Sequence, residues 1–98
     1  MNKADIYQKL RAKSDRCHYC GIREGDFWHV YGRYFRGGRR GRRLELDRRD
    51  PKNKHYTLAN CVLACYPCND AKSDIFSYRE FKVIGRAIRR VWKKKNKR

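Results

Sequence analysis

The chain has 98 residues, of which 27 are lysine or arginine and only 10 are aspartate or glutamate, so its formal net charge is +17. This length fits one domain with a modest core, to which a bound metal ion would add useful stability. The excess of positive charge, interleaved with aromatic residues, favours nucleic acid as the partner. A membrane surface is the competing partner, but a peripheral membrane segment would concentrate the basic residues on one amphipathic helix.

The sequence predicts neither a membrane span nor an export signal. No apolar run approaches the roughly 18 residues of a span, and the N-terminal MNKADIYQKL has no apolar signal core. We therefore expect an intracellular protein. The five cysteines are an odd number, and disulfides do not persist in a reducing compartment, so metal ligation is the better explanation of any cysteines that cluster.

Two short elements are predicted on either side of the basic middle of the chain. Residues 3 to 13 suit a helix, because Ile6 and Leu10 lie four apart on one face and Asn2 can cap its start. After a proline break and a polar connection, residues 55 to 58 can form a short strand.

The basic middle of the chain is predicted to form a hairpin. Residues 27 to 35, FWHVYGRYF, are aromatic and β-branched and are expected to be extended. The glycines at 37 and 38 offer a turn, and residues 43 to 47 return as a second extended run. A flexible loop is the alternative for residues 33 to 43, because glycine and like charge both favour disorder.

The last element is a helix that should begin at Tyr78. Ser77 and Glu80 have the spacing of a capping box, and Phe76 faces Phe81 at the staple position. Apolar residues that share one side of this helix are expected to be core. They are Phe81, Ile84, Ile88, Val91 and Trp92.

Four of the cysteines form two C-x-x-C pairs, Cys17 with Cys20 and Cys65 with Cys68. Each pair places two thiolates on one tight turn, and two such pairs make a tetrahedral four-sulfur zinc site. Four thiolates close the coordination shell, so this zinc would hold structure and could not activate water. Disulfides or a redox pair are the alternative. Cys61 is left over and is interpreted as a small buried core residue, with a fifth ligand as the alternative.

With this cysteine frame, LELD at residues 44 to 47, Asn60, and CNDAK at residues 68 to 72 resemble the HNH endonucleases of the ββα-metal type. Zinc-containing members of that family include phage proteins similar to recombination endonuclease VII. The resemblance covers residues 17 to 75. The order and spacing of these pieces are jointly specific, although each piece alone is weak.

The resemblance implies the fold class, α+β, with a small zinc-stapled ββα-metal (His-Me finger) core and a flanking C-terminal helix. We expect a single domain over residues 1–98. Its zinc-bound core would span residues 17–75, its basic C-terminal helix residues 77–94 and its basic tail residues 95–98.

Carried over by position, the resemblance makes Asp47 and Asn69 ligands of a catalytic metal ion, Asn60 a brace of the loop and Lys72 a phosphate contact. A carboxylate and an amide oxygen are hard ligands suited to magnesium or manganese, and two protein ligands leave room for water and phosphate. Each residue also has a structural alternative. Asp47 could pair with one of the two following arginines, Asn69 could cap a helix, and Lys72 could be an ordinary solvated lysine.

The departure from the family pattern is Arg48, which stands where the family has the histidine that deprotonates water. The pKa of arginine is too high for a base, so Arg48 is expected to clamp the scissile phosphate. The base would then be another histidine. His55 is the first choice, across the polar connection from Asp47, and His29 is the second, because the predicted hairpin register pairs it with Arg48. His18, inside the zinc turn, is interpreted as a surface residue or a donor to sulfur.

The sequence therefore predicts a DNA endonuclease that uses Mg²⁺ or Mn²⁺ and contains a structural zinc. Its partner would be DNA and not a membrane. Its DNA would be double-stranded or branched, and its compartment the cytoplasm of a bacterial or phage-infected cell; a monomer and a homodimer both stay open. Arginines of the basic arm would contact phosphate: Arg36, Arg39, Arg40, Arg42 and Arg43. The alternatives are a catalytically silent zinc-bound module that binds nucleic acid, and a ribosome-associated zinc protein.

Overall fold

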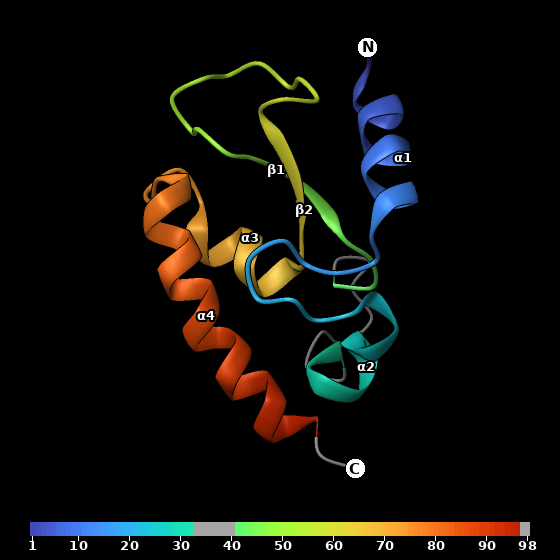
Figure 1. Cartoon of the computed structure of the whole chain (residues 1–98), viewed down its shortest axis with the longest axis vertical. Coiled ribbons are helices and arrows are strands. Elements are labelled where there is room, and N and C mark those ends of the chain that lie inside the picture. Colours follow the sequence, from blue (N-terminus) through green and yellow to red (C-terminus); the bar gives the residue numbers. More distant parts are fainter. Residues whose placement is uncertain (33–40, 97–98) are drawn as a thin grey trace.

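The computed structural model describes residues 1–32 and 41–96, and Figure 1 shows the arrangement of its elements. In chain order they are α1 (Lys3–Lys13), the 3-10 turn η1 (Glu24–Asp26), α2 (Phe27–Val30), β1 (Glu45–Arg48), β2 (Cys61–Ala64), α3 (Tyr66–Lys72) and α4 (Tyr78–Lys95). This is the predicted α+β class, with two adjacent strands followed directly by a helix. None of the helices in the described ranges is both long enough and apolar enough to cross a membrane.

The two strands form an antiparallel sheet in which Glu45 pairs with Ala64 and Arg48 pairs with Cys61. Every residue of β2 is buried, because α1 packs against this strand and β1 lies along its edge. α3 packs against β1 (Figure 1). The buried strand therefore anchors the unit, while β1 faces the helix that follows it.

Helix α1 forms where it was predicted. The Asn2 side chain accepts a hydrogen bond from the backbone N–H of Asp5 at 2.8 Å, which satisfies one of the free donors at the helix start. Ile6 is fully buried and Leu10 is partly buried against the core. The periodicity of apolar residues thus identified both the helix and its inner face.

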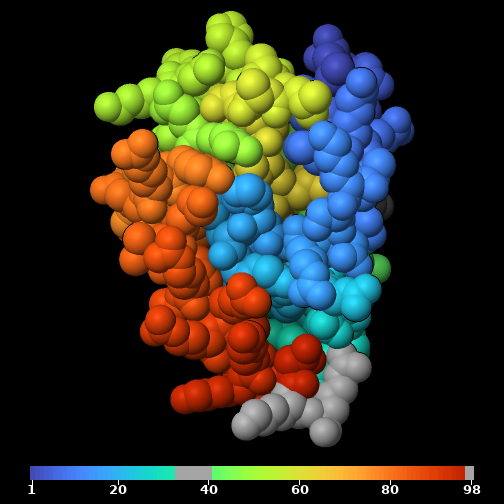
Figure 2. All heavy atoms as spheres, viewed as in Figure 1, coloured from blue at the N-terminus to red at the C-terminus, as the bar shows by residue number. Residues whose placement is uncertain are grey.

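Helix α4 also begins as predicted, and it runs exposed along one side of the molecule (Figure 2). Ser77 and Glu80 form both hydrogen bonds of the capping box. Phe81 is fully buried, and the ring centroid of Phe76 lies 6.1 Å from that of Phe81. The predicted stripe is wrong at Val91, which is 49% exposed, because at 100° per residue this position turns toward the flank of the helix.

The predicted strand over residues 27 to 35 is wrong for the part that the structure describes, because residues 27 to 30 form helix α2. Phe27, Val30 and Tyr31 are buried at helical spacing, and the rings of Phe27 and Tyr31 lie 5.2 Å apart. Packing of these side chains outweighs their preference for strands. The predicted hairpin register fails with the strand, since Arg48 pairs with Cys61. Residues 33 to 40, including the predicted glycine turn, lie outside the described residues.

The predicted strand over residues 55 to 58 is also wrong, because these residues belong to a loop and a turn. Asn60 accounts for the difference. Its side-chain nitrogen donates to the carbonyl oxygens of Asn53 and His55, at 3.3 and 3.2 Å, and its Oδ1 accepts from the N–H of Asp50 at 3.1 Å. Backbone groups that a strand would use for pairing are therefore bound by one buried asparagine.

Candidate functional site

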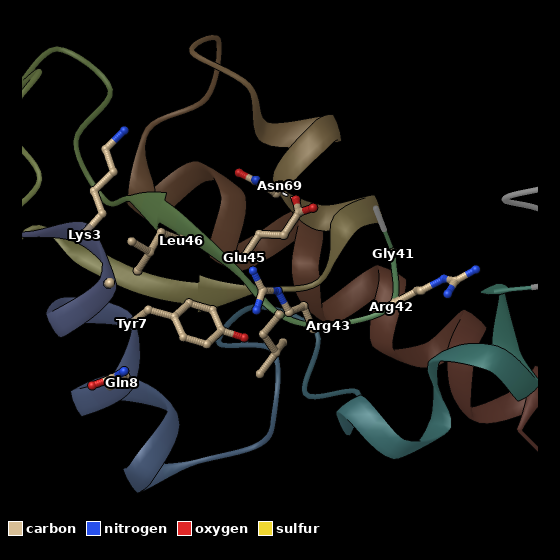
Figure 3. Close-up of a pocket in the computed structure, with 11 residues that line it drawn as sticks. Lys3, Tyr7, Gln8, Gly41, Arg42, Arg43, Glu45, Leu46 and Asn69 are labelled. Carbon is tan, nitrogen blue, oxygen red and sulfur yellow. Dashed lines mark hydrogen bonds between the residues drawn. The ribbon is translucent and has the colours of Figure 1, made fainter. Parts of the chain in front are cut away.

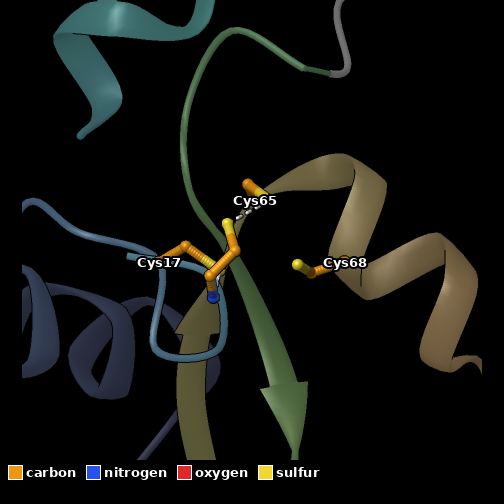
Figure 4. A group of neighbouring side chains, drawn as sticks. Cys17, Cys65 and Cys68 are labelled. Atoms are coloured by element: carbon orange, nitrogen blue, oxygen red, sulfur yellow. Dashed lines mark hydrogen bonds between the residues drawn. The ribbon is translucent and has the colours of Figure 1, made fainter. Parts of the chain in front are cut away.

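The four paired cysteines converge on one point, although they come from two distant parts of the chain (Figure 4). The sulfur atoms of Cys17, Cys20, Cys65 and Cys68 all lie within 4.8 Å of one another, and all four residues are buried. Four sulfur atoms bound about 2.3 Å from one tetrahedral zinc ion would also lie within 4.8 Å of one another, so the four cysteines fit zinc. The cluster joins the turn after α1 to the start of α3.

The thiols of this cluster also influence one another's ionisation. Hydrogen bonds from neighbouring thiols, first from Cys20 and then from Cys65 and Cys68, lower the pKa of Cys17. The thiolate is the form that binds metal. Gly21, which follows the first pair, has φ +75°, a conformation that other residues rarely adopt, and its N–H donates to the Cys17 carbonyl at 3.0 Å. This turn brings Cys17 and Cys20 to the same side.

Asp47 projects from β1 into the interior, where it is only 6% exposed. The hydroxyl of Tyr19 donates to its Oδ2 at 2.5 Å, and the ammonium group of Lys72 lies 3.5 Å from its carboxylate. Burial raises the pKa of Asp47, while the bonds from Tyr19 and Lys72 oppose that rise. The sequence offered Arg48 or Arg49 as an alternative ion-pair partner of Asp47, but the contacts of its carboxylate are to Tyr19 and Lys72.

Lys72 is fully buried, so the prediction that it contacts phosphate is wrong. Its ammonium group donates to the carbonyl oxygen of Arg48 at 2.9 Å and faces Asp47. A buried lysine needs such partners because an unpaired charge in the interior is costly. The lysine at the end of α3 therefore stabilises β1 and partly neutralises Asp47.

Asn69 lies one turn before Lys72 on α3 and is oriented by Glu45 of β1 (Figure 3). Its side-chain nitrogen donates to Oε1 of Glu45 at 2.9 Å. The amide oxygen thus stays available as an acceptor, which is the atom a metal ion would bind. Glu45 and Asp47 lie on the same face of β1, because side chains two apart in a strand point to one side.

A small cavity of about 140 Å³ brings the candidate residues together. Asp47, Arg48 and Asn69 all line it. Tyr56 and Asp74 line it as well. The Arg48 side chain is held by long contacts of 3.3 Å to the Asn53 carbonyl and 3.4 Å to Asp74, and its guanidinium carbon lies 5.4 Å from the centre of the Tyr56 ring. Hard oxygen ligands and a guanidinium group therefore share one site.

Among the residues that the structure describes, the cavity wall contains no histidine. His55 is exposed on the loop that Asn60 holds, directly before Tyr56 of the cavity wall. His29 lies on α2, so the register argument that placed it beside Arg48 no longer supports a catalytic role. His18 lies 2.6 Å from the hydroxyl of Tyr78, and burial, followed by the charges of Arg49 and Lys82, lowers its pKa.

Four residues of the site were missed in the sequence. Glu45 had a signal, because strand alternation places it on the face of Asp47. Tyr19 sits between the zinc-binding cysteines, and Tyr56 and Asp74 sit in connections, so only the folded chain brings these three to the site. Of the predicted arm, Arg42 and Arg43 are exposed. Arg36, Arg39 and Arg40 lie outside the described residues.

Comparison with known proteins gives one informative similarity. No family model matches the chain, and no curated protein matches it. Among solved structures, the chain is similar to the rare-cutting HNH restriction endonuclease PacI, with 30% sequence identity and a TM-score of 0.68. The similarity covers 96% of this chain and 82% of that chain.

Proposed function

Because the chain belongs to the HNH endonuclease family, we propose that it cleaves DNA by hydrolysing phosphodiester bonds with the help of a divalent metal ion. One observation carries this proposal. Asp47, Arg48 and Asn69, which the family resemblance selects, line the same cavity on a ββα unit. The similar restriction endonuclease supports DNA as the substrate.

The residues at the cavity fit a hard divalent ion such as Mg²⁺ or Mn²⁺. The carboxylate of Asp47 and the amide oxygen of Asn69 are the ligands that we assign, and Glu45 holds the Asn69 amide in place. A bound ion would neutralise charge that develops on the phosphate. Lys72, 3.5 Å from Asp47, would share this carboxylate with the ion and keep it oriented.

Arg48 is the proposed phosphate clamp. Its side chain is 19% exposed at the cavity. Its ion pair with Asp74, at 3.4 Å and with Asp74 77% exposed, is weak enough for a phosphate oxygen to replace the Asp74 carboxylate. Guanidinium binds phosphate with two parallel hydrogen bonds, which orients the scissile group and stabilises negative charge in the transition state. Tyr56, beside the guanidinium group, restricts where it can move.

The proposed general base is His55, which adjoins the cavity residue Tyr56 in sequence and is accessible to water. His55→Ala should lower the cleavage rate by about 10² to 10⁴ and leave DNA affinity nearly unchanged, because a base acts in the transition state. His29→Ala is the matched control. If His29→Ala is inactive and His55→Ala is not, the assignment is wrong; if neither matters, water is activated without a histidine.

Plasmid nicking tests the proposed function directly. Purified protein should cut supercoiled or branched DNA in magnesium or manganese, should stop when a chelator removes these ions, and should lose activity in Asp47→Asn. Asparagine keeps the shape of the side chain while removing the charge that binds the ion. DNA binding without cleavage in either metal would contradict the enzyme.

One observation favours the second candidate function, a silent module that binds nucleic acid. Six exposed basic residues fall on one flank of α4: Arg79, Lys82, Arg86, Arg89, Arg90 and Lys93. Such a surface binds phosphates without reading bases, so affinity should fall steeply with salt and depend little on sequence. The same surface would serve an endonuclease, so the nicking assay separates the two functions.

A further inference from the structure

A second, larger hollow lies between α1 and the segment that enters β1 (Figure 3). Its volume is about 1040 Å³. Lys3, Tyr7 and Gln8 of α1 form one wall, and Arg42 and Arg43 lie on the segment that leads into β1. We call this hollow the α1 groove. Helix α1 precedes residues 17 to 75, which carry the family's sequence motifs, so those motifs assign no role to its residues.

The α1 groove leads into the candidate active site. Leu46 and Asn69 line both the groove and the 140 Å³ cavity, so the two hollows share a wall. The ammonium group of Lys3 lies 4.0 Å from the centre of the Tyr56 ring, and Arg48 lies against the same ring at 5.4 Å. A ligand bound at Arg48 can therefore extend past Tyr56 and Lys3 along α1.

The α1 groove is positively charged and carries an aromatic side chain. Lys3, Arg42 and Arg43 are exposed, and the described residues offer none of them an ion pair. Glu45 is the one acid among the described residues of the wall, and it accepts a hydrogen bond from Asn69. The guanidinium carbon of Arg43 lies 5.4 Å from the centre of the Tyr7 ring (Figure 3). Among the described residues that line the groove, basic side chains therefore outnumber acidic ones by three to one.

We propose that the α1 groove binds the DNA strand next to the scissile phosphate, with Lys3, Arg42 and Arg43 contacting successive phosphates and Tyr7 contacting a sugar or base. Figure 3 shows Lys3, Arg43 and Arg42 at separate places along the groove, an arrangement that suits the repeating phosphates of a DNA strand. Basic grooves with interleaved aromatic residues are how proteins follow a nucleic-acid strand. This inference rests on the proposed function, because the cavity gives the strand its position.

The test measures DNA binding in chelator, where cleavage plays no part. Lys3→Gln and Arg43→Gln should each reduce the slope of log affinity against log salt by about 0.9, and the double variant by about twice that amount, because each lost phosphate contact releases one counterion fewer. Lys9→Gln is the matched control. It removes the same charge from an exposed position of α1 outside the groove, so its slope should stay close to that of the unmodified protein.

Cleavage kinetics provide a second readout. Lys3→Gln should raise KM while kcat stays within about twofold, because the contact binds substrate and transition state alike. If Lys3→Gln and Arg43→Gln bind with the same salt slope as Lys9→Gln, the α1 groove does not carry DNA, whatever the nicking assay shows. If the slopes differ as expected and the protein never cuts, the DNA surface stands and only the proposed enzymatic function fails.

Discussion

The zinc cluster and the cavity at Asp47 are built in opposite ways. The cluster is closed: four buried sulfurs face one another and offer a zinc ion every ligand it needs. The cavity is open, with two hard oxygen ligands, a guanidinium group and space for a phosphate. A closed shell converts metal binding into folding energy, whereas an open one leaves positions for substrate and water. One small chain thus separates its stabilising ion from the ion proposed for chemistry.

Tyr19 connects these two regions. It lies between Cys17 and Cys20 in sequence, and its hydroxyl donates to Asp47 at 2.5 Å. The backbone of the same residue packs against Gly85 of α4, so closely that a methyl group there would lie 2.6 Å from the Tyr19 carbonyl oxygen. The turn that carries Cys17 and Cys20 therefore also orients the carboxylate of the candidate active site.

The largest expected effect comes from opening the closed shell. Cys65→Ser should leave the protein unfolded, as should removal of zinc, because a structural zinc contributes on the order of 10 kcal/mol, comparable with the whole stability of a small domain. Circular dichroism and elemental analysis check this. Cys61→Ala is the control, since Cys61 is equally buried but lies outside the cluster, and it should keep one zinc per chain. Folded, zinc-free protein would contradict the assignment.

The next effect concerns the buried charges of the open site. Lys72→Met should lower the free energy of unfolding by about 3 to 5 kcal/mol, because it leaves the Asp47 carboxylate buried without its cation. Adding Asp47→Asn should recover part of this loss. A denaturation series of the two single variants and the double variant measures the coupling.

The same variants sharpen the comparison of the two ions. If Asp47 binds the divalent ion, magnesium should raise the Tm of Lys72→Met more than that of the unmodified protein, because the ion takes the place of the missing ammonium group. The Asp47→Asn variant should lose this response. An equal shift in all variants would show that magnesium binds elsewhere.

Close packing between the zinc turn and α4 gives the third effect. Gly85→Ala should lower the free energy of unfolding by about 1 to 3 kcal/mol, since the added methyl group meets the backbone of Tyr19, between the cysteines of the first pair. Gly25→Ala is the matched control, because nothing lies within 4 Å of its new methyl group. Thermal denaturation should separate the two variants. Equal Tm values would mean that α4 moves away from the turn without cost.

The parts of the molecule that sequence predicted correctly depend on local spacing. The C-x-x-C pairs place two sulfurs on one turn, and the Ser77–Glu80 capping box fixes the start of α4 within four residues. Similarly, Asn2 and Ile6 identify α1 within a single turn of helix. In each case the physical cause and the sequence signal lie in the same short segment.

The parts that sequence missed depend on contacts made across the fold. Phe27 to Val30 has the composition of a strand, yet its helix is stabilised by burial of residues at helical spacing. Lys72 follows a polar run on α3, and nothing near it in sequence shows that Asp47 of β1 will be its partner. The sequence around His55 is typical of a strand, but in the fold Asn60 binds the carbonyl oxygens of Asn53 and His55 and keeps this segment a loop. These features follow only from tertiary structure.

The smallest effect on stability tests the connection between the two regions. Tyr19→Phe removes the hydrogen bond to Asp47 but keeps the ring, whose centroid lies 5.0 Å from that of Phe81. We expect a loss of about 1 kcal/mol, typical of one hydrogen bond, and one zinc per chain as before. The nicking rate should fall by more than the loss of stability explains, because the Asp47 carboxylate, freed from Tyr19, can rotate away from Asn69. Denaturation, elemental analysis and nicking rates measure these three quantities.

Tyr78→Phe is the control for this last prediction, because the Tyr78 hydroxyl lies 2.6 Å from His18, whereas Tyr19 is the tyrosine that bonds Asp47. It removes the same group from a neighbouring ring, 6.0 Å from that of Tyr19, so its effect on stability should be similar. Its nicking rate should stay near that of the unmodified protein. If both variants lose activity equally, the aromatic cluster acts as a whole. If only Tyr19→Phe does, the zinc turn positions Asp47 through this one hydroxyl.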